Sequence, residues 1–233
     1  MARHVIVTGV PRADDRSIAA LRSFGVATVH EAMGRAGSLG PGIQARQHGS
    51  TVAGSAVTVL CWPGDNLMIH AAVEQCHDGD VLVVATAAPS THGFFGELLA
   101  TSLARRGVHG VVIDAGVRDT RELREMGFGV WSRHVSAEGT VKATAGHVNL
   151  PVVIAGQSIQ PGDVVVADDD GVVVVPRLDA AAVVEASQAR IATEAASRAA
   201  FQAGELGLDR YGIRPLLQKL GVEYVAYGDV DKR

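Results

Sequence analysis

Residues 81–119 read VLVVATAAPSTHGFFGELLATSLARRGVHGVVIDAGVRD, and this stretch decides the fold. Two nearly continuous apolar runs, 81–85 and 111–113, predict strands that are covered on both faces. Between them, a helix-like segment from about Phe94 to Arg106 is followed by a glycine. A strand, a helix and a second strand in this order favour parallel pairing with a right-handed crossover. The sequence therefore predicts an α/β fold.

Polar residues gather where these two strands are expected to end. Glu97 begins the first helix-like segment, and Arg118 and Asp119 begin the next. Ligands of open α/β sheets bind beyond the carboxyl ends of the strands, where free amides such as those of residues 96–99 attract anions. Two carboxylates suit Mg²⁺ or Mn²⁺, and an arginine can hold a substrate carboxylate with two hydrogen bonds. We expect one site here, although from spacing alone a helix cap with a surface ion pair remains an alternative.

The composition excludes several classes of protein. The chain has 233 residues, of which 47% are hydrophobic and 4% aromatic, and its net charge is -4. Dispersed basic residues and few aromatics do not fit nucleic-acid binding. The two cysteines, Cys61 and Cys76, show no metal-binding or disulfide pattern. No apolar run is long enough to span a membrane or to act as a signal peptide, so we expect a cytoplasmic protein.

The remaining sequence predicts further strands and a helical end. Thr28 and Glu31 fit a capping box, which predicts a short helix through Met33. Asp-Gly between the β-branched runs 164–166 and 172–175 predicts a hairpin. From about Leu178 to Phe201, an Ala-, Glu- and Arg-rich composition favours one long helix. We therefore divide the chain into a domain of residues 1–177 and a C-terminal helical extension of residues 178–233.

A resemblance to a known family adds to this interpretation. Glu97, twenty further residues, Arg118-Asp119 and then Glu122 resemble the D/E-x20-R-D-x2-E/D signature of the 4-hydroxy-4-methyl-2-oxoglutarate and 4-carboxy-4-hydroxy-2-oxoadipate aldolases. These are class II pyruvate aldolases related to RraA. The likeness extends over nearly the whole chain, through residues 26–34, 63–66, 96–100 and 161–171.

The resemblance implies an αββα-type sandwich, the RraA-like swivelling β/β/α fold, with a C-terminal helical extension that packs on a neighbouring subunit. It implies a homotrimer or a hexamer built as a dimer of trimers, with the site at a subunit boundary. Asp119 would hold Mg²⁺ or Mn²⁺ directly, and Glu97 would act through metal-bound water. Glu194, on the neighbouring subunit's helix, is the nearest match to a further glutamate that approaches the metal through water.

The implied catalytic residues are Arg118, Glu97 and Asp119, and the implied substrate-binding turn is Gly96, Glu97, Leu98 and Leu99 together with Arg118. Arg118 would bind the pyruvate portion of the substrate with the amides of Leu98 and Leu99. The implied reaction is metal-dependent retro-aldol cleavage of 4-carboxy-4-hydroxy-2-oxoadipate to pyruvate and oxaloacetate, or of 4-hydroxy-4-methyl-2-oxoglutarate to two pyruvates. Such a lyase serves the breakdown of aromatic compounds such as protocatechuate and gallate, and the same chemistry permits oxaloacetate decarboxylation.

Two alternatives use the chain differently. A Schiff-base aldolase needs a lysine, and Lys142 is the candidate within the core. Because Lys142 lies away from both turns in the sequence, we expect it to be structural. The second alternative is an RraA-like regulator that binds a ribonuclease complex and has no catalytic activity.

Overall fold

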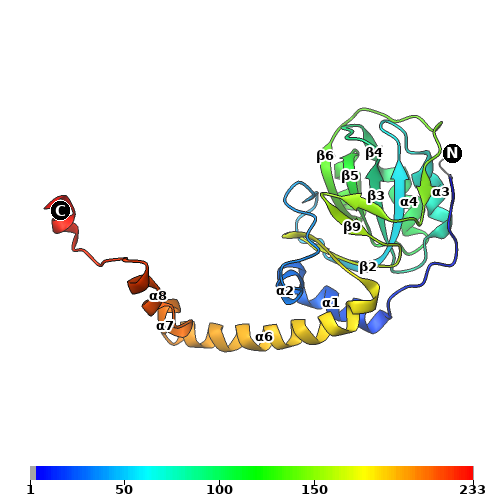
Figure 1. The fold of residues 1–233 in the computed structure, drawn as a ribbon. Coiled ribbons are helices and arrows are strands. Elements are labelled where there is room, and N and C mark those ends of the chain that lie inside the picture. Colours follow the sequence, from blue (N-terminus) through cyan, green and yellow to red (C-terminus); the bar gives the residue numbers. More distant parts are fainter. Residues whose placement is uncertain (1–3, 233) are drawn as a thin grey trace. The chain divides into compact units, whose positions relative to one another are not determined.

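The structure is a computed structural model that describes residues 4–232. It divides into two units, the first ending at Gln188 and the second beginning at Ala189, and each is described by itself. Figure 1 labels the helices and strands for which there is room. Among residues 4–232, no helix combines the length and the hydropathy that crossing a membrane would require.

The first unit combines short helices with a large mixed sheet (Figure 1). Its helices are α1 (Asp15–Phe24), α2 (Val26–Ala32), α3 (Leu67–Ala72), α4 (Glu97–Ala104), α5 (Thr120–Glu125) and the first part of α6 (Ala180–Gln202), with 3-10 turns at Val73–Gln75 and Arg177–Asp179. Its strands are β1 (Gln44–Ala45), β2 (Val52–Cys61), β3 (Val81–Thr86), β4 (Gly93–Phe95), β5 (Gly110–Val117), β6 (Gly129–Val135), β7 (His147–Val148), β8 (Val152–Ile154), β9 (Gln157–Ile159), β10 (Val164–Asp168) and β11 (Gly171–Val175).

The sheet has the order β1-β6-β5-β3-β2-β10-β11, and β2 joins its two halves. Residues 56–61 of β2 pair in parallel with β3, whereas residues 52–55 pair antiparallel with β10. Strands β3, β5 and β6 continue the parallel half, as the strand-helix-strand pattern predicts. The hairpin of β10 and β11 closes through Asp168 and Gly171, which confirms the Asp-Gly prediction.

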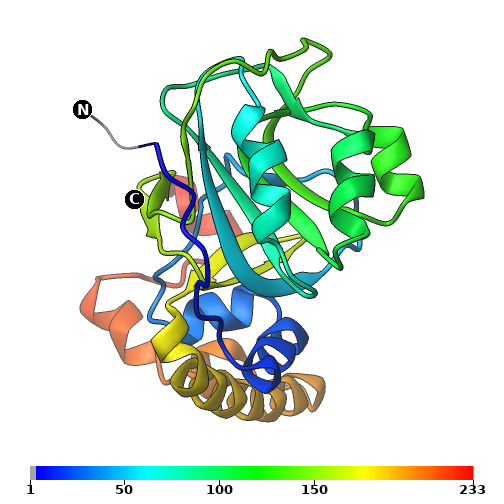
Figure 2. The same ribbon diagram turned by 90° about the vertical axis from the view of Figure 1, so that its right-hand side faces the viewer.

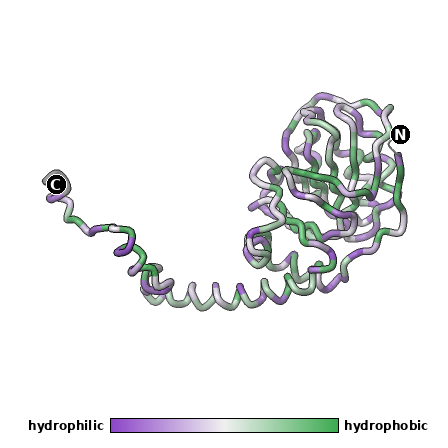
Figure 3. Tube along the Cα trace, viewed as in Figure 1, coloured by the Kyte–Doolittle hydropathy of each residue, from purple (hydrophilic) through white to green (hydrophobic). Residues whose placement is uncertain are grey.

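The alternation of buried side chains shows four layers. Leu82 and Val84 of β3 face the helices α3, α4 and α5, whereas Val81 and Val83 face the other half of the sheet. The same division recurs in the second half, where Val165 packs inward and Val164 packs against α1, α2 and the start of α6. In Figure 2, the cyan and green helices accordingly lie on one side of the strands and the blue helices on the other. The expected αββα sandwich is confirmed, and Figure 3 shows hydrophobic residues along its strands.

Two local expectations are wrong. Thr28 does not cap α2, because α2 begins at Val26 directly after Gly25, and the Val26 amide donates to the Asp168 carboxylate over 2.8 Å. A side chain from a distant hairpin therefore starts this helix. Phe94 lies in strand β4 rather than in a helix, and β4 pairs in parallel with β5. A bare glycine at position 116 permits this approach, since an added Cβ would lie 2.5 Å from the Thr91 carbonyl oxygen.

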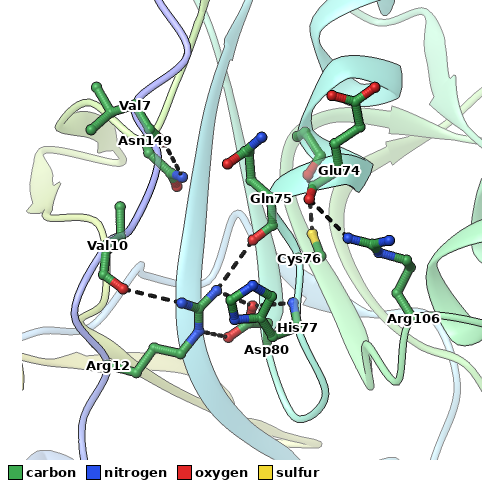
Figure 4. A network of polar contacts seen from close by, with 11 residues as sticks. Val7, Val10, Arg12, Glu74, Gln75, Cys76, His77, Asp80, Arg106 and Asn149 are labelled. Atoms are coloured by element: carbon green, nitrogen blue, oxygen red, sulfur yellow. Dashed lines mark hydrogen bonds and ion pairs between the residues drawn. The ribbon is translucent and has the colours of Figure 1, made fainter.

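A buried ion pair attaches the N-terminal segment to the sheet (Figure 4). The Arg12 guanidinium donates to both oxygens of Asp80, from Nε over 2.8 Å and from a terminal nitrogen over 2.7 Å. The His77 amide donates to the same carboxylate over 2.7 Å. The Asp80 side chain is only 1% exposed, so all three bonds act away from solvent.

The second unit is helical and has little core of its own. It contains the rest of α6, α7 (Gly207–Arg210), α8 (Arg214–Lys219) and a 3-10 turn at Tyr227–Lys232. The predicted long C-terminal helix is confirmed by the 23 residues of α6. Phe201 and Tyr211 meet edge to face, with ring centroids 5.9 Å apart. Among the described side chains from Ala189 to Asp229, none that is apolar is buried, which fits an extension rather than an independent core.

Candidate active site

The two polar turns lie side by side at one edge of the sheet. Strand β4 ends at Phe95 and leads into α4, and β5 ends at Val117 and leads into α5. Because β4 and β5 run parallel, Glu97 in one turn and Asp119 in the other come together at their carboxyl ends. The structure therefore brings the two turns together, as the sequence predicts.

Backbone contacts connect the turns directly. The Arg118 amide donates to the Phe95 carbonyl over 2.8 Å, and the Glu97 amide donates to Asp119 Oδ2 over 3.1 Å. Gly96 lies so close to Asp119 that an added Cβ would be 2.3 Å from Oδ2. Only glycine leaves room for the Asp119 carboxylate at this point. Gly96 therefore allows the Asp119 carboxylate to lie against the first turn of α4.

Asp119 has an unusual backbone. Its φ of 55° and ψ of 38° lie in the left-handed region, which only a small fraction of residues other than glycine adopt. The conformation turns the chain sharply between β5 and α5 and points the carboxylate toward the first turn of α4. Such strain is retained where the surrounding structure enforces it, commonly at functional sites.

The charged groups here remain accessible. The side chains of Arg118 and Asp119 are 46% and 39% exposed, and Arg118 Nε lies 3.6 Å from Asp119 Oδ2. Glu97 Oε1 accepts a hydrogen bond from the Thr101 hydroxyl over 2.8 Å, one turn along α4. The first intrahelical bond of α4 runs from the Ala100 amide to the Gly96 carbonyl, so the amides of Leu98 and Leu99 precede it. Carboxylates, a guanidinium and free amides therefore share one surface.

A small hollow of about 90 Å³ opens beside this group. Its polar lining comprises Asn66, His70, Arg118, Asp119 and Lys142, and Leu98 and Leu99 form part of its wall. A second hollow, of about 360 Å³, shares Arg118 and Asp119 and extends along residues 135–137. Arg118 and Asp119 thus stand between two spaces, each able to accept part of a ligand.

Lys142 lies nearer to the two turns than its place in the sequence suggests. It is distant from both turns in sequence, yet it lines the same hollow as Arg118 and Asp119. The Asp65 carboxylate brings it there, because Oδ2 accepts from the amides of Ala143 over 2.8 Å and Thr144 over 2.7 Å. The Pro-Gly-Asp turn at residues 63–65 signals a helix start, but no feature of the sequence tells which distant loop its aspartate holds.

Asn66 and His70 are further lining residues that the sequence does not reveal. Asn66 is 6% exposed, and its Nδ2 donates to the Phe94 carbonyl over 2.8 Å. Its Oδ1 is buried and, within the part of the chain that the structure describes, has no hydrogen-bond partner. Burial and the charge of Lys142 lower the pKa of His70. A buried unpaired acceptor is costly and indicates that a ligand or water donates there.

The donor set fits a hard divalent cation that keeps several waters. In residues 4–232, no three His, Cys, Asp or Glu side chains converge on one point. One chain offers Asp119, seated against Gly96, and Glu97 nearby, and Mg²⁺ commonly binds through one or two carboxylates with water and substrate completing its shell. Glu194 lies in the second unit, where Arg190 Nε is 2.9 Å from its carboxylate.

Comparison with known proteins identifies the family. The family model described as "RraA-like: Aldolase/RraA" matches residues 26–174, from α2 through β11. The chain belongs to the RraA-like family. This match includes both turns and the Lys142 loop, whereas α6 and the second unit follow it. The RraA-like core therefore carries the candidate site, and the helical extension lies outside the matched region.

Two curated relatives of this RraA-like chain are both named "Putative 4-hydroxy-4-methyl-2-oxoglutarate aldolase". One, from Halalkalibacterium halodurans, is 32% identical over 126 residues, which is 54% of this chain and 60% of the relative. The other, from Burkholderia multivorans, is 38% identical over 122 residues, which is 52% of this chain and 74% of the relative.

A solved structure confirms the RraA-like fold. Streptomyces coelicolor RraAS2, described as an unusual member of the RNase ES inhibitor RraA protein family, is 31% identical with a TM-score of 0.74. The likeness covers 82% of this chain and 99% of that one. This chain is thus similar in sequence to relatives named as aldolases and in structure to a relative named for ribonuclease inhibition.

Proposed function

We propose that this protein is a divalent-metal pyruvate aldolase that cleaves 4-carboxy-4-hydroxy-2-oxoadipate or 4-hydroxy-4-methyl-2-oxoglutarate and releases pyruvate. The observation that carries the proposal is the convergence of Arg118, Asp119 and the first turn of α4 on one hollow. The names of the two curated relatives support the same reaction class. A place in the breakdown of aromatic compounds is part of the proposal.

Arg118 and the amides of Leu98 and Leu99 bind the 2-oxo acid end of the substrate. A guanidinium donates two parallel hydrogen bonds to the two oxygens of a carboxylate, and free helix-start amides add further donors. The exposed position of Arg118 leaves its terminal nitrogens available for this task. As negative charge develops on the pyruvate oxygen, these fixed donors stabilise it more than they stabilise the starting ketone.

Asp119 is the residue that would hold Mg²⁺ or Mn²⁺. When bound there, the cation supplies Lewis acidity that polarises the 2-oxo group. Gly96 and the Glu97 amide fix the Asp119 carboxylate before any ligand arrives, so little reorganisation is needed. Glu97, oriented by the Thr101 hydroxyl, holds water at the same place.

Glu97 also directs the proton. In retro-aldol cleavage the C4 hydroxyl loses its proton and its oxygen forms the carbonyl group of the second product as the C3–C4 bond breaks. The electron pair of that bond passes into the pyruvate enolate, which is then protonated at C3. We assign the first proton to a water that Glu97 orients. Asn66, His70 and Lys142 face the same hollow and suit the carboxylate at C4 of either substrate.

A neighbouring copy of the chain completes the site. One chain supplies two carboxylates at this edge, and Glu194 of a neighbouring subunit is the proposed third, acting through water in a trimer or a dimer of trimers. Apolar side chains around the hollow are exposed, Leu98 by 78% and Val141 by 62%, which suits burial by a partner.

The decisive test is pyruvate release from 4-hydroxy-4-methyl-2-oxoglutarate and from 4-carboxy-4-hydroxy-2-oxoadipate. A coupled assay with lactate dehydrogenase measures the pyruvate. We expect turnover with Mg²⁺, loss on chelation with EDTA, and return on adding Mg²⁺. Asp119→Ala abolishes release, while the matched control Asp170→Ala, in the β10–β11 turn, retains it. Activity that survives exhaustive chelation, or labelling of Lys142 by borohydride with pyruvate, contradicts the metal mechanism.

The second candidate function is ribonuclease inhibition, which the likeness to Streptomyces coelicolor RraAS2 favours. It requires no chemistry at Asp119. No pyruvate release from either substrate, together with inhibition of a ribonuclease by wild type and Asp119→Ala alike, would replace the aldolase proposal with this one.

A further inference from the structure

A large hollow lies away from the candidate active site, at the amino ends of the parallel strands. It measures about 680 Å³ and adjoins His109, directly before β5, and Gly129, where β6 begins. Arg118 follows the other end of the eight-residue β5, about 25 Å away at the usual rise per residue. The hollow is within the size range of small-molecule sites and is separate from the proposed catalytic one.

The lining combines an apolar floor with hydrogen-bond donors. The buried side chains of Val52, Val108 and Phe128 form the floor. The polar lining consists of Arg22, Gln47, His48, Ser50, Thr51, His109 and Arg124, and it contains no aspartate or glutamate. Two carboxylates lie behind the wall. Asp169 accepts from the Gly49 amide, and Asp78 lies against Gly107.

Gln47 supplies the observation that points to a ligand. Its side chain is 5% exposed, and its Oε1 accepts from the Val130 amide over 3.0 Å. Its Nε2 is buried and, within residues 4–232, donates to no protein atom. A buried N–H without an acceptor is unfavourable, and a ligand oxygen in the hollow would relieve it.

Arg124 and Arg22 are available for the same ligand. In the described chain neither guanidinium forms an ion pair or a side-chain hydrogen bond. Arg124 is not needed to satisfy the end of α5, because the amides of Gly127 and Phe128 already bond the carbonyls of Arg124 and Leu123. Both arginines can therefore donate hydrogen bonds to a ligand, while the nearby carboxylates of Asp78 and Asp169 offset part of their positive charge.

We infer that this hollow binds a small organic acid. Its carboxylate accepts from Gln47 Nε2 and the two arginines, and its apolar body covers the floor at Val108 and Phe128. The carboxylate receives charge-assisted hydrogen bonds from the arginines, which are stronger than bonds to a neutral group, so a neutral molecule of the same shape binds poorly.

The test is calorimetric titration of the full chain with benzoate, with benzyl alcohol as the neutral analogue and inorganic phosphate as an anion without an apolar body. We expect saturable benzoate binding, at least tenfold tighter than that of benzyl alcohol or phosphate. Arg118→Gln leaves this binding unchanged, which separates the hollow from the candidate active site. Arg124→Gln weakens it about tenfold, whereas Arg121→Gln, an equal charge change on the same helix, does not.

Gln47→Glu gives a second, nearly isosteric test. It keeps an oxygen that can accept from the Val130 amide and replaces the unpaired donor with a carboxylate oxygen, so benzoate binding is lost while a cooperative thermal transition shows that the chain folds. Absence of saturable benzoate binding, loss of binding in Arg118→Gln, or equal effects of Arg121→Gln and Arg124→Gln overturns the inference.

Discussion

The two ends of the parallel strands treat their carboxylates in opposite ways. Asp80, directly before β3, is 1% exposed and accepts two bonds from Arg12 and one from the His77 amide. Asp119, after β5, is 39% exposed and accepts one amide bond, with Arg118 Nε only loosely placed at 3.6 Å. A carboxylate whose bonds are all made within the protein fixes the fold. One that keeps free acceptors beside fixed donors can bind a ligand.

Removing the guanidinium at the carboxyl end gives the largest expected effect. Arg118→Gln lowers kcat/KM for pyruvate release by about 10³, or about 4 kcal/mol, because the enolate oxygen loses its charged donor. The free energy of unfolding changes by less than about 0.5 kcal/mol, since the side chain is half exposed. Steady-state kinetics and urea denaturation measure the two quantities. A large loss of stability would show that Arg118, like Asp80, stabilises the fold.

Removing the guanidinium at the amino end reverses the pattern. Arg12→Gln lowers the free energy of unfolding by about 3 kcal/mol, because the buried Asp80 carboxylate loses its cation. The kcat of the folded protein stays at the wild-type value. Urea denaturation at pH 7 gives the first result, and adding Asp80→Asn to Arg12→Gln recovers part of the stability. A fall in kcat without loss of stability would contradict the division between the two ends.

Replacing Lys142 tests whether the candidate site extends to the loop between β6 and β7. Lys142→Met raises KM for 4-hydroxy-4-methyl-2-oxoglutarate about tenfold, because the substrate's C4 carboxylate loses a cation, while kcat changes less. Lys219→Met, in the second unit, is the control with the same chemical change. An unchanged KM in Lys142→Met would return Lys142 to a structural role.

Replacing Asp65 gives the smallest expected effect on stability or activity. It is also the sharpest test, because the Asp65 carboxylate, like that of Asp80, accepts its hydrogen bonds from within the protein although it lies beside the candidate site. Burial would raise its pKa, but bonds from the amides of Leu67, Ala143 and Thr144 outweigh it, so the pKa lies below its ordinary value of 3.8. The stability this provides is present above that value and is lost as pH falls through the lower folded-state pKa.

Asp65→Asn therefore lowers the free energy of unfolding at pH 7 by about 1 kcal/mol. The difference from wild type shrinks as the pH falls below about 4, where wild-type Asp65 also becomes protonated. Thermal unfolding measured from pH 3 to pH 7 follows this trend. A constant difference over that range would show that the amide bonds do not favour the ionised carboxyl group.

The residues themselves predicted an α/β fold and the meeting of the two turns, and the family resemblance implied the layered sandwich. The nearly continuous apolar runs 81–85 and 111–113 predict strands buried on both faces, and parallel order places Glu97 and Asp119 at one edge. The prediction failed where distant groups decide local structure. Asp168, and not Thr28, starts α2, and the short strand β4 forms because Gly116 lets it approach β5.

Local periodicity was enough to place the strands at 81–85 and 111–113, the hairpin at 164–175 and the long C-terminal helix. Motifs within about twenty residues of one another carried the family resemblance and pointed to Arg118 and Asp119. Only the tertiary structure decided that Lys142 and Asn66 share the hollow, that Asp119 takes a left-handed backbone, and that Gln47 is buried with an unused donor. The physical reason is that buried hydrogen bonds join partners far apart in the chain, such as Asp65 and Thr144, and their pairing is fixed by packing rather than by spacing.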